Sequence, residues 1–169
     1  TAIGVVLPSI NNMFFPEVID GIQAKFKDSD YSLILNCSNN NIDDEIRCIH
    51  DLISRNVAGI IVLDPNTDNV KSKFYTNISK KIPIVFINGY SPSANISSIS
   101  NDESYGAHIA LNHLIENNHK NILFIRGKAS FSYDVKESVY IEKMKEIGKL
   151  NSKRIINIGE GNSKNTVDN

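Results

Sequence analysis

The sequence predicts an α/β fold of the doubly wound class, in which helices cover both faces of a parallel sheet. Three observations support this prediction. Short runs of β-branched and apolar residues recur along the chain, as expected for strands that are buried on both faces. Helix-length segments with one apolar stripe separate most of these runs. Strands and helices that alternate through right-handed crossovers form a parallel sheet with helices on both of its faces.

The first part of the chain alternates regularly between the two kinds of segment. Ile3 to Leu7 is a β-branched run and predicts the first strand. Apolar residues at helical spacing from Phe15 to Phe26 then predict a helix with one buried face. Tyr31 to Leu35 predicts the second strand, and isoleucines at helical spacing from Ile42 to Ile53 predict the second helix.

The alternation continues and then breaks. Ala58 to Leu63 predicts a strand, Thr67 to Ser79 a weaker helix, and Ile84 to Ile87 another strand. The next extended segment, Asn95 to Ser100, follows without a helix between the strands. We therefore expect a boundary between two lobes near residue 101.

The second lobe repeats the pattern on a smaller scale. Apolar stripes from Ala107 to Ile115 and from Val139 to Ile147 predict two helices. Ile122 to Ile125 and Arg154 to Ile158 predict two strands, and the polar residues from Gly159 to Asn169 add no further strand. Because a sheet typically contains four to six strands, we expect this lobe to be incomplete.

Composition excludes several classes of protein. The 169 residues include 18 Lys and Arg and 19 Asp and Glu, so the formal net charge of −1 lacks the basic excess of a DNA-binding surface. No apolar run approaches the about 18 residues of a membrane span, and the first residues lack the basic region and cleavage site of a signal peptide. The two cysteines form no disulfide framework. We therefore expect a cytoplasmic protein without a membrane partner.

In a parallel sheet, the carboxyl ends of all strands lie at one edge, and ligands bind in the crevice there. The segments that follow the predicted strands at this edge are Ser9 to Met13, Asn36 to Asn41, Asp64 to Asn66, Asn88 to Tyr90 and Gly127 to Tyr133.

The first of these loops has the most informative chemistry. Asn11, Asn12, Phe14 and Phe15 lie at the start of a predicted helix, where N–H donors and a partial positive charge are available. Aromatic faces stack on flat or ring-shaped ligands, so an amide beside an aromatic ring suits a sugar or a base. The alternative, that Asn12 only caps the helix and one phenylalanine belongs to the core, is equally open.

The chain lacks the patterns typical of enzymes and metal sites. It contains no GxSxG elbow, HExxH motif or phosphate-binding loop. His108 and His113 are five residues apart and so face different sides of a helix, without a partner at metal-ligand spacing. Asp43, Asp44 and Glu45 lie at a helix start, where acids favour the dipole, and are expected to form a solvated cap. We therefore expect no enzymatic activity, no metal and no cofactor.

The segment from Ile3 to Ile22 closely resembles the start of the effector-binding domain of lactose-repressor/galactose-repressor (LacI/GalR) transcription regulators. It contains Ile3-Gly4-Val5-Val6-Leu7-Pro8 and continues through Asn11-Asn12-Met13-Phe14-Phe15-Pro16. Four further segments match the family in the family's order. These are Gly59-Ile60-Ile61, Ile82-Pro83-Ile84-Val85 and the run from Asn101 to Ala107, followed by His113 to Ile122.

The resemblance implies a type I periplasmic-binding-protein-like fold, with two lobes around an effector cleft. Residues 1–101 would form the first lobe and residues 102–169 part of a truncated second lobe. The implied function is effector sensing in a transcription regulator, a repressor, with a sugar or related metabolite as the effector.

Family members pair as homodimers and bind operator DNA through a helix-turn-helix headpiece. We expect operator DNA to be reached only through a headpiece that is absent from this chain. The alternative is a sugar-binding protein of a transport system, which shares the fold and the Asn-Asn-x-Phe-Phe start.

Applied to this chain, the resemblance assigns ligand binding to Asn12, Phe14, Phe15, Asn88, Phe131 and Tyr133. Two positions depart from the family pattern. Asn88-Gly89 stands where many members carry Asp-Arg, and Glu137 stands where they carry an arginine. A guanidinium donates paired hydrogen bonds to hydroxyls or carboxylates, and neither glycine nor glutamate can do so. We therefore expect stacking and amide contacts without these two cationic groups.

Overall fold

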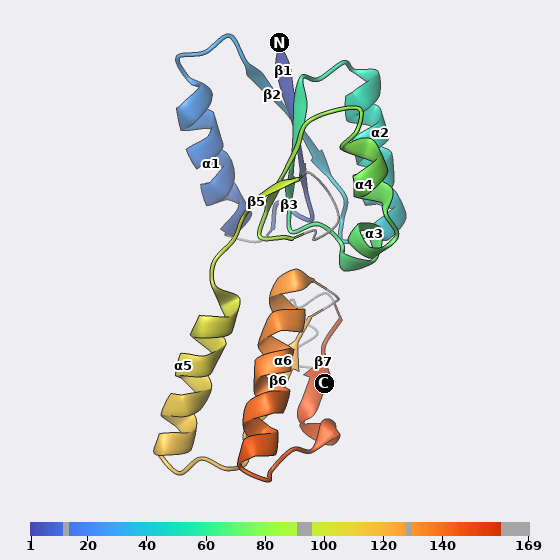
Figure 1. Cartoon of the computed structure of the whole chain (residues 1–169). Helices are drawn as coiled ribbons and strands as arrows, with labels where there is room; N and C mark the ends of the chain where they lie inside the picture. Colours follow the sequence, from blue (N-terminus) through green and yellow to red (C-terminus); the bar gives the residue numbers. More distant parts are fainter. Residues whose placement is uncertain (12–13, 91–95, 128–129, 160–169) are drawn as a thin grey trace. The chain divides into compact units, whose positions relative to one another are not determined.

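The computed structural model describes residues 1–11, 14–90, 96–127 and 130–159. The chain divides into two compact units, Thr1–Ser100 (unit 1) and Asn101–Asn169 (unit 2) (Figure 1). The assignment of these units as two lobes of one effector-binding domain stays a prediction.

Unit 1 is built around a five-stranded sheet of order β2-β1-β3-β4-β5, in which every strand is parallel to its neighbours. Its elements are β1 (Ala2–Leu7), α1 (Phe14–Phe26), β2 (Ser32–Cys37), α2 (Ile42–Ser54), β3 (Gly59–Leu63), α3 (Thr67–Lys71), α4 (Phe74–Ile78), β4 (Ile84–Ile87) and β5 (Ser97–Ile99). Figure 1 shows α1 on one face of the sheet and α2, α3 and α4 on the other. The predicted doubly wound α/β fold is therefore confirmed.

The inner strand β1 is buried on both faces of the sheet, because its neighbouring side chains enter different cores. Val5 and Leu7 are fully buried and pack in a cluster with Phe15 and Ile19 of α1. Val6 belongs to the cluster on the opposite face, which includes residues of α2 and α4. Each buried side chain of this kind contributes about 1.5–3 kcal/mol, so β1 stabilises both layers at once.

One predicted helix is interrupted. The segment from Thr67 to Ser79 forms two short helices, α3 and α4, instead of one. Lys73 lies between them with a φ of 66°, in the left-handed region, where a right-handed helix cannot continue. Asn66 caps α3, since its side chain accepts a hydrogen bond from Asp68 N at 2.9 Å.

Unit 2 contains two helices that pack against a parallel sheet, which has two strands within the described ranges. Its elements are α5 (Glu103–Glu116), β6 (Phe124–Arg126), α6 (Phe131–Glu146), the 3₁₀ turn η1 (Ser152–Arg154) and β7 (Ile155–Asn157). Tyr140 and Met144 of α6 are fully buried in its core. The Tyr140 hydroxyl donates to Ile122 O at 2.8 Å, which satisfies its one polar group.

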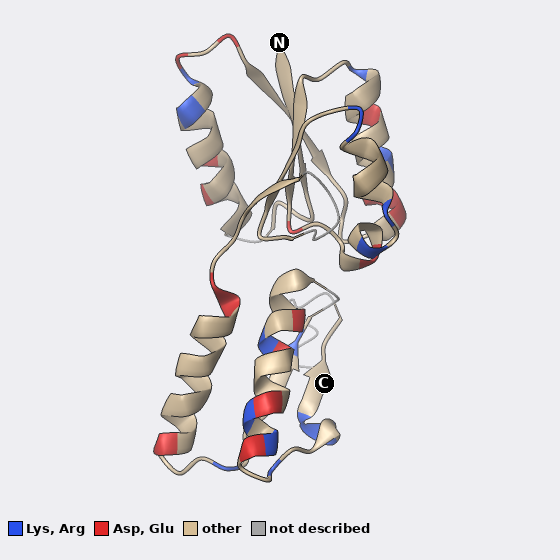
Figure 2. Cartoon of the chain, viewed as in Figure 1, with Lys and Arg blue, Asp and Glu red and all other residues tan. Residues whose placement is uncertain are grey.

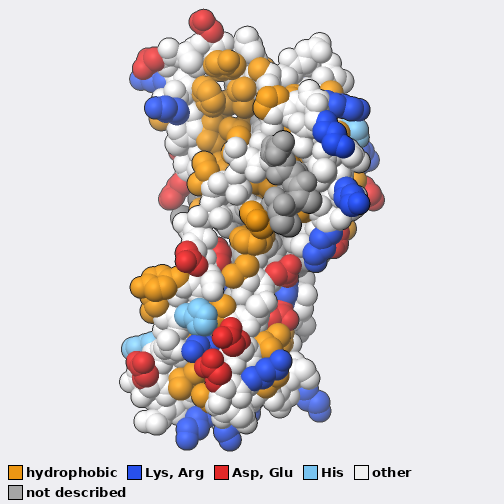
Figure 3. Space-filling view, viewed as in Figure 1, with side chains coloured by type: hydrophobic (Ala, Val, Ile, Leu, Met, Phe, Trp, Pro, Cys, Tyr) orange, Lys and Arg blue, Asp and Glu red, His pale blue; other side chains and the backbone are white. Residues whose placement is uncertain are grey.

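Charged side chains lie on helices and loops, and the strands carry almost none (Figure 2). Among the strands that the structure describes, Arg126 at the end of β6 is the one charged residue. Apolar side chains also reach the surface of both units (Figure 3). The most exposed large ones are Ile10, Ile99 and Tyr105, each 65% exposed.

We predict opposite effects for the same substitution at two glycines. A Cβ at Gly4 in β1 would lie 2.7 Å from Cδ1 of the fully buried Leu52, so Gly4→Ala should lower the free energy of unfolding by about 1–3 kcal/mol. A Cβ at Gly21 in α1 would meet nothing within 4 Å. Gly21→Ala should therefore raise the free energy of unfolding by about 0.5–1 kcal/mol.

Urea denaturation followed by circular dichroism measures both values. A neutral Gly4→Ala variant or a destabilised Gly21→Ala variant would contradict this packing.

Candidate functional site

The carboxyl ends of β1, β3 and β4 lie at one edge of the sheet in unit 1, since these strands are parallel. The loops that follow them share this edge, as the sequence predicts. Asp64 N donates to Ile87 O and Asn88 N donates to Ile99 O, both at 2.8 Å, so each loop is fixed to a neighbouring strand. Asn88 Nδ2 also donates to Asp64 Oδ1 at 3.5 Å. The edge thus brings an amide and a carboxylate together.

The two phenylalanines at the start of α1 have different surroundings. Phe15 is 5% exposed and belongs to the core beneath α1, whereas Phe14 is 43% exposed. Their rings meet edge to face, with centroids 5.5 Å apart. One ring therefore belongs to the core and the other lies at the surface, close to the sheet edge. Asn12, the amide predicted beside them, lies outside the described residues.

Gly89 stands where a side chain would collide with a proline ring. A Cβ at this position would lie 2.4 Å from Pro65 Cγ and 2.5 Å from Pro65 Cδ. A pyrrolidine ring cannot rotate away as a flexible side chain can. A side chain at position 89, arginine included, would therefore collide with Pro65 in the loop after β3.

Glu45, in the first turn of α2, is buried. It is 3% exposed, and its carboxylate accepts hydrogen bonds from Tyr75 OH at 2.7 Å, Asn69 Nδ2 at 2.9 Å and Asn66 N at 3.0 Å. The expectation of a solvated acidic cap is therefore wrong for this residue. The physical reason is that its donors come from positions 21 to 30 residues farther along the chain.

Burial governs the ionisation of this cluster. It raises the pKa of Glu45 above its ordinary value, and the hydrogen bonds from Asn69, Tyr75 and Asn66 oppose this rise. The pKa of Tyr75 lies well above its ordinary value, because burial and the nearby Glu45 carboxylate both disfavour the phenolate. Tyr75 therefore remains a neutral hydrogen-bond donor to Glu45.

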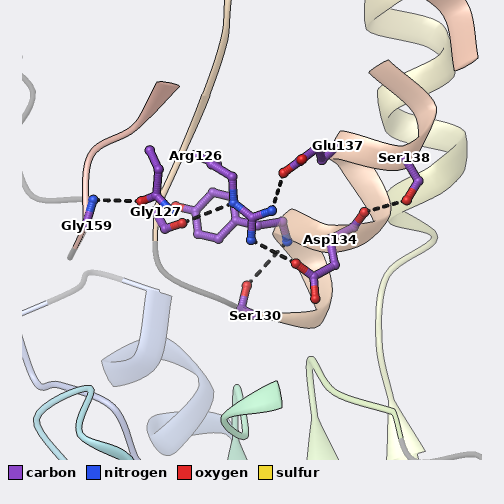
Figure 4. Close-up of polar contacts among 9 residues, drawn as sticks. Arg126, Gly127, Ser130, Asp134, Glu137, Ser138 and Gly159 are labelled. Carbon is purple, nitrogen blue, oxygen red and sulfur yellow. Dashed lines mark hydrogen bonds and ion pairs between the residues drawn. The ribbon is translucent and has the colours of Figure 1, made fainter. Parts of the chain in front are cut away.

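Arg126 is the charged centre at the carboxyl end of β6 in unit 2 (Figure 4). Its Nη2 donates to Asp134 Oδ1 at 2.8 Å, its Nη1 donates to Glu137 Oε2, and its Nε donates to Gly127 O at 3.3 Å. Asp134 and Glu137 project from the first turns of α6 toward the guanidinium. Burial lowers the pKa of Arg126, but its bonds to the two carboxylates outweigh this effect and hold the pKa above its ordinary value.

Tyr133 packs against the same group. Its ring centroid lies 5.8 Å from Arg126 Cζ, and a Cβ on Gly127 would lie 3.0 Å from Tyr133 Cε2. The absence of a side chain at Gly127 thus lets the tyrosine ring approach the backbone. Ser130 caps α6 by accepting a hydrogen bond from Tyr133 N at 3.3 Å, and Phe131 begins the helix. The two aromatic residues predicted as ligand contacts therefore share the helix start that holds Arg126.

Sequence reasoning missed this guanidinium. The sequence predicts that unit 2 has no cationic group here, because Glu137 stands in place of an arginine. This prediction is wrong, since Arg126 lies against the Glu137 carboxylate. The available signal was a charged residue that directly follows the apolar pair Phe124-Ile125 in a strand. The pairing itself joins residues 11 positions apart across a strand and a helix, which local periodicity does not report.

Within the described ranges, no group of three or more His, Cys, Asp or Glu side chains could hold a metal ion. No helix in the same ranges is long and apolar enough to cross a membrane. Cys37 and Cys48 are free and half-buried, and Cys48 Sγ lies 3.6 Å from Cys37 O.

Comparison with known proteins identifies relatives. The family model described as periplasmic binding protein domain matches residues 3–166. Catabolite control protein A of Priestia megaterium is 30% identical over 128 residues, which are 75% of this chain and 38% of that protein. The ribose operon repressor of Halalkalibacterium halodurans is 29% identical over 125 residues, which are 74% of this chain and 36% of that protein. The chain thus spans less than half the length of these curated relatives.

A solved structure of a regulator is also similar to this chain. The crystal structure of a periplasmic binding protein/LacI transcriptional regulator from Alkaliphilus metalliredigens, complexed with D-xylulofuranose, is 25% identical in sequence, with a TM-score of 0.77. The match covers 99% of this chain and 60% of that one.

We predict that the Glu45 cluster is a main determinant of the stability of unit 1. Glu45→Ala should lower the free energy of unfolding by about 2–4 kcal/mol, because the buried Tyr75 hydroxyl and Asn69 amide lose their acceptor. Urea denaturation measures the change. Glu116→Ala, at an exposed position of α5, is the control and should change the value by less than about 0.5 kcal/mol.

The cluster also predicts the sign of a pH dependence. A carboxyl group whose pKa is higher in the folded protein binds its proton more tightly when folded. The contribution of Glu45 to stability is therefore fully present below its ordinary pKa of 4.5 and is lost as the pH rises through its higher folded pKa. The free energy of unfolding of the wild type, relative to that of Glu45→Gln, should fall across this window. A difference that rises with pH would show that the sign is wrong.

Proposed function

This chain belongs to the periplasmic binding protein domain family and matches the effector-binding domain of LacI/GalR regulators, and on that premise we propose that it senses a small-molecule effector within a transcription repressor. The effector is a sugar or a related metabolite. The observation that carries this proposal is the edge of the unit 1 sheet where the parallel strands β1, β3 and β4 end, together with the exposed ring of Phe14 at the start of α1.

The chemistry at this edge suits a polyhydroxyl ligand. Phe14 offers an exposed aromatic face, and Asn88 and Asp64 offer an amide and a carboxylate. Phe131 and Tyr133 are the contacts that we propose from unit 2, and Asn12 is a further proposed contact in unit 1. The bound D-xylulofuranose in the Alkaliphilus metalliredigens regulator supports a sugar as the ligand class.

The mechanism we propose is a population shift. An effector that binds one conformation of the regulator more tightly increases the population of that conformation. Operator DNA would be bound through a headpiece of the kind that the family resemblance implies, in the cytoplasm, and its affinity would change with the conformation.

The alternative function is sugar binding in a transport system. The names of the curated relatives, catabolite control protein A and ribose operon repressor, favour the regulator. The scaffold alone does not distinguish the two functions, because one fold hosts many functions.

A sugar panel tests the proposal. D-ribose, D-glucose, sucrose and D-xylulose are added separately while thermal unfolding is followed by circular dichroism. We expect one sugar to raise the melting temperature by about 5 °C or more at a concentration of about 100 Kd, because ligand that binds only the folded state stabilises it. No shift with any of these sugars would contradict the sugar as the effector class.

The contribution of the aromatic face can be measured with the sugar that binds. Phe14→Ala should weaken its affinity about tenfold in isothermal titration calorimetry, since the stacking surface is lost. Tyr105→Ala removes another exposed aromatic ring, on α5, and should leave the affinity unchanged. Equal effects of the two variants would argue against the proposed contact.

We also propose that two copies pair through the β2 edge of unit 1. β2 is an outer strand of the sheet, and Tyr31 and Leu35 at this edge are 44% and 42% exposed. An edge strand with exposed apolar side chains favours pairing with another chain. Symmetric dimers are the commonest assemblies of this kind.

Sedimentation velocity tests this pairing. Leu35→Asp should shift the chain from dimer toward monomer, because it introduces charge into the apolar edge. Ile99→Asp places the same charge on the opposite outer strand, β5, and should leave the dimer intact. A monomeric wild type would contradict the proposed dimer. Dissociation by Ile99→Asp alone would show that the interface lies at the β5 edge instead.

A further inference from the structure

Arg126, Asp134 and Glu137 together form the charged centre of unit 2. In this cluster the carboxylates are more exposed than the guanidinium. The Arg126 side chain is 12% exposed, whereas the side chains of Asp134 and Glu137 are 40% and 24% exposed. A ligand that approaches this helix start therefore meets carboxylate oxygens before it meets the cation.

Three of the five N–H groups of Arg126 are engaged within unit 2. Nη1 and Nη2 each bind one carboxylate, and Nε binds Gly127 O. An anionic group on a ligand would therefore meet a cation that is already paired with two carboxylates. Counted over the described residues, two carboxylates on one guanidinium leave one net negative charge, which repels an approaching phosphate or carboxylate.

The carboxylates retain capacity for neutral partners. Each uses one oxygen for Arg126, and Asp134 Oδ2 and Glu137 Oε1 receive no donor among the described residues (Figure 4). Hydroxyl groups donate well to such oxygens, and hydrogen bonds to a charged acceptor are stronger than neutral ones.

Among the described residues, the nearby Lys136 does not change this balance. Lys136 Nζ lies 2.9 Å from Glu103 Oε2 and donates to Ser132 Oγ at 2.9 Å. Ser132 Oγ in turn donates to Glu103 Oε1 at 2.9 Å. This lysine is therefore neutralised by its own partner and is not available to offset Asp134 or Glu137.

On the premise of the effector-sensing function proposed above, we propose that Arg126, Asp134 and Glu137 determine specificity by selecting uncharged polyhydroxyl effectors and excluding phosphorylated or carboxylated ones. Asp134 and Glu137 accept hydrogen bonds from effector hydroxyls. Arg126 is a positioning residue that holds the two carboxylates at the start of α6.

The test uses anions as probes on the intact chain, with inorganic phosphate and D-glucose 6-phosphate titrated at constant ionic strength. The wild type should show no saturable binding of either anion in calorimetry and no rise in melting temperature. The isosteric double variant Asp134→Asn/Glu137→Gln releases the guanidinium and should bind both anions at least about tenfold more tightly than the wild type. Adding Arg126→Gln to the double variant should abolish this gain, because the cation is then absent.

A matched control separates local charge from total charge. Glu116→Gln/Glu142→Gln changes the net charge equally at two exposed helix positions of unit 2 and should gain no anion binding. Saturable binding of either anion by the wild type would overturn the proposal, and this measurement does not depend on how well the variants fold. A folded double variant that gains no affinity, or a gain that survives Arg126→Gln, would also overturn it. Failure of every neutral sugar to bind would instead contradict the effector-sensing function and would leave these anion measurements unchanged.

Discussion

The described strands run parallel to their neighbours within each sheet, and this constraint decides where polar chemistry can lie. A parallel strand needs a crossover to bring the chain back to the same end, so helices cover both faces and strand side chains are apolar on both sides. Val5 and Val6 are both buried for this reason, although they point in opposite directions. The inner strands β1, β3 and β4 carry no polar side chains, and the polar residues Asp64 and Asn88 directly follow two of them, as Arg126 ends β6.

Two buried charges depart from this apolar interior, and each is compensated differently. Glu45 is surrounded by neutral donors, which connect α2 to α3, α4 and the loop after β3. Arg126 is compensated by charge, with one carboxylate on each Nη atom. A buried charge without such partners would cost several kcal/mol, and each of these two charges has at least three hydrogen bonds that offset this cost.

The two arrangements differ in what they leave for other molecules. The Glu45 carboxylate is 3% exposed and directs its hydrogen bonds to its own unit, so its role is structural. The carboxylates around Arg126 remain partly exposed at a helix start and keep acceptor capacity. At position 89, by contrast, no charged side chain fits, because the Pro65 ring fills the space that it would need. Local packing therefore determines which charged groups each sheet edge can present.

The sequence by itself determined the fold class and the order of elements. Strand and helix periodicities follow from backbone geometry within a few residues, so β4 falls at Ile84–Ile87 as predicted, and the crossover rule then fixes which loops share an edge. Only the tertiary structure decided which of two adjacent similar residues is buried, as for Phe14 and Phe15. Only the tertiary structure pairs Arg126 with Glu137. Packing brings these two residues together from separate elements, and local periodicity in the sequence does not report such pairs.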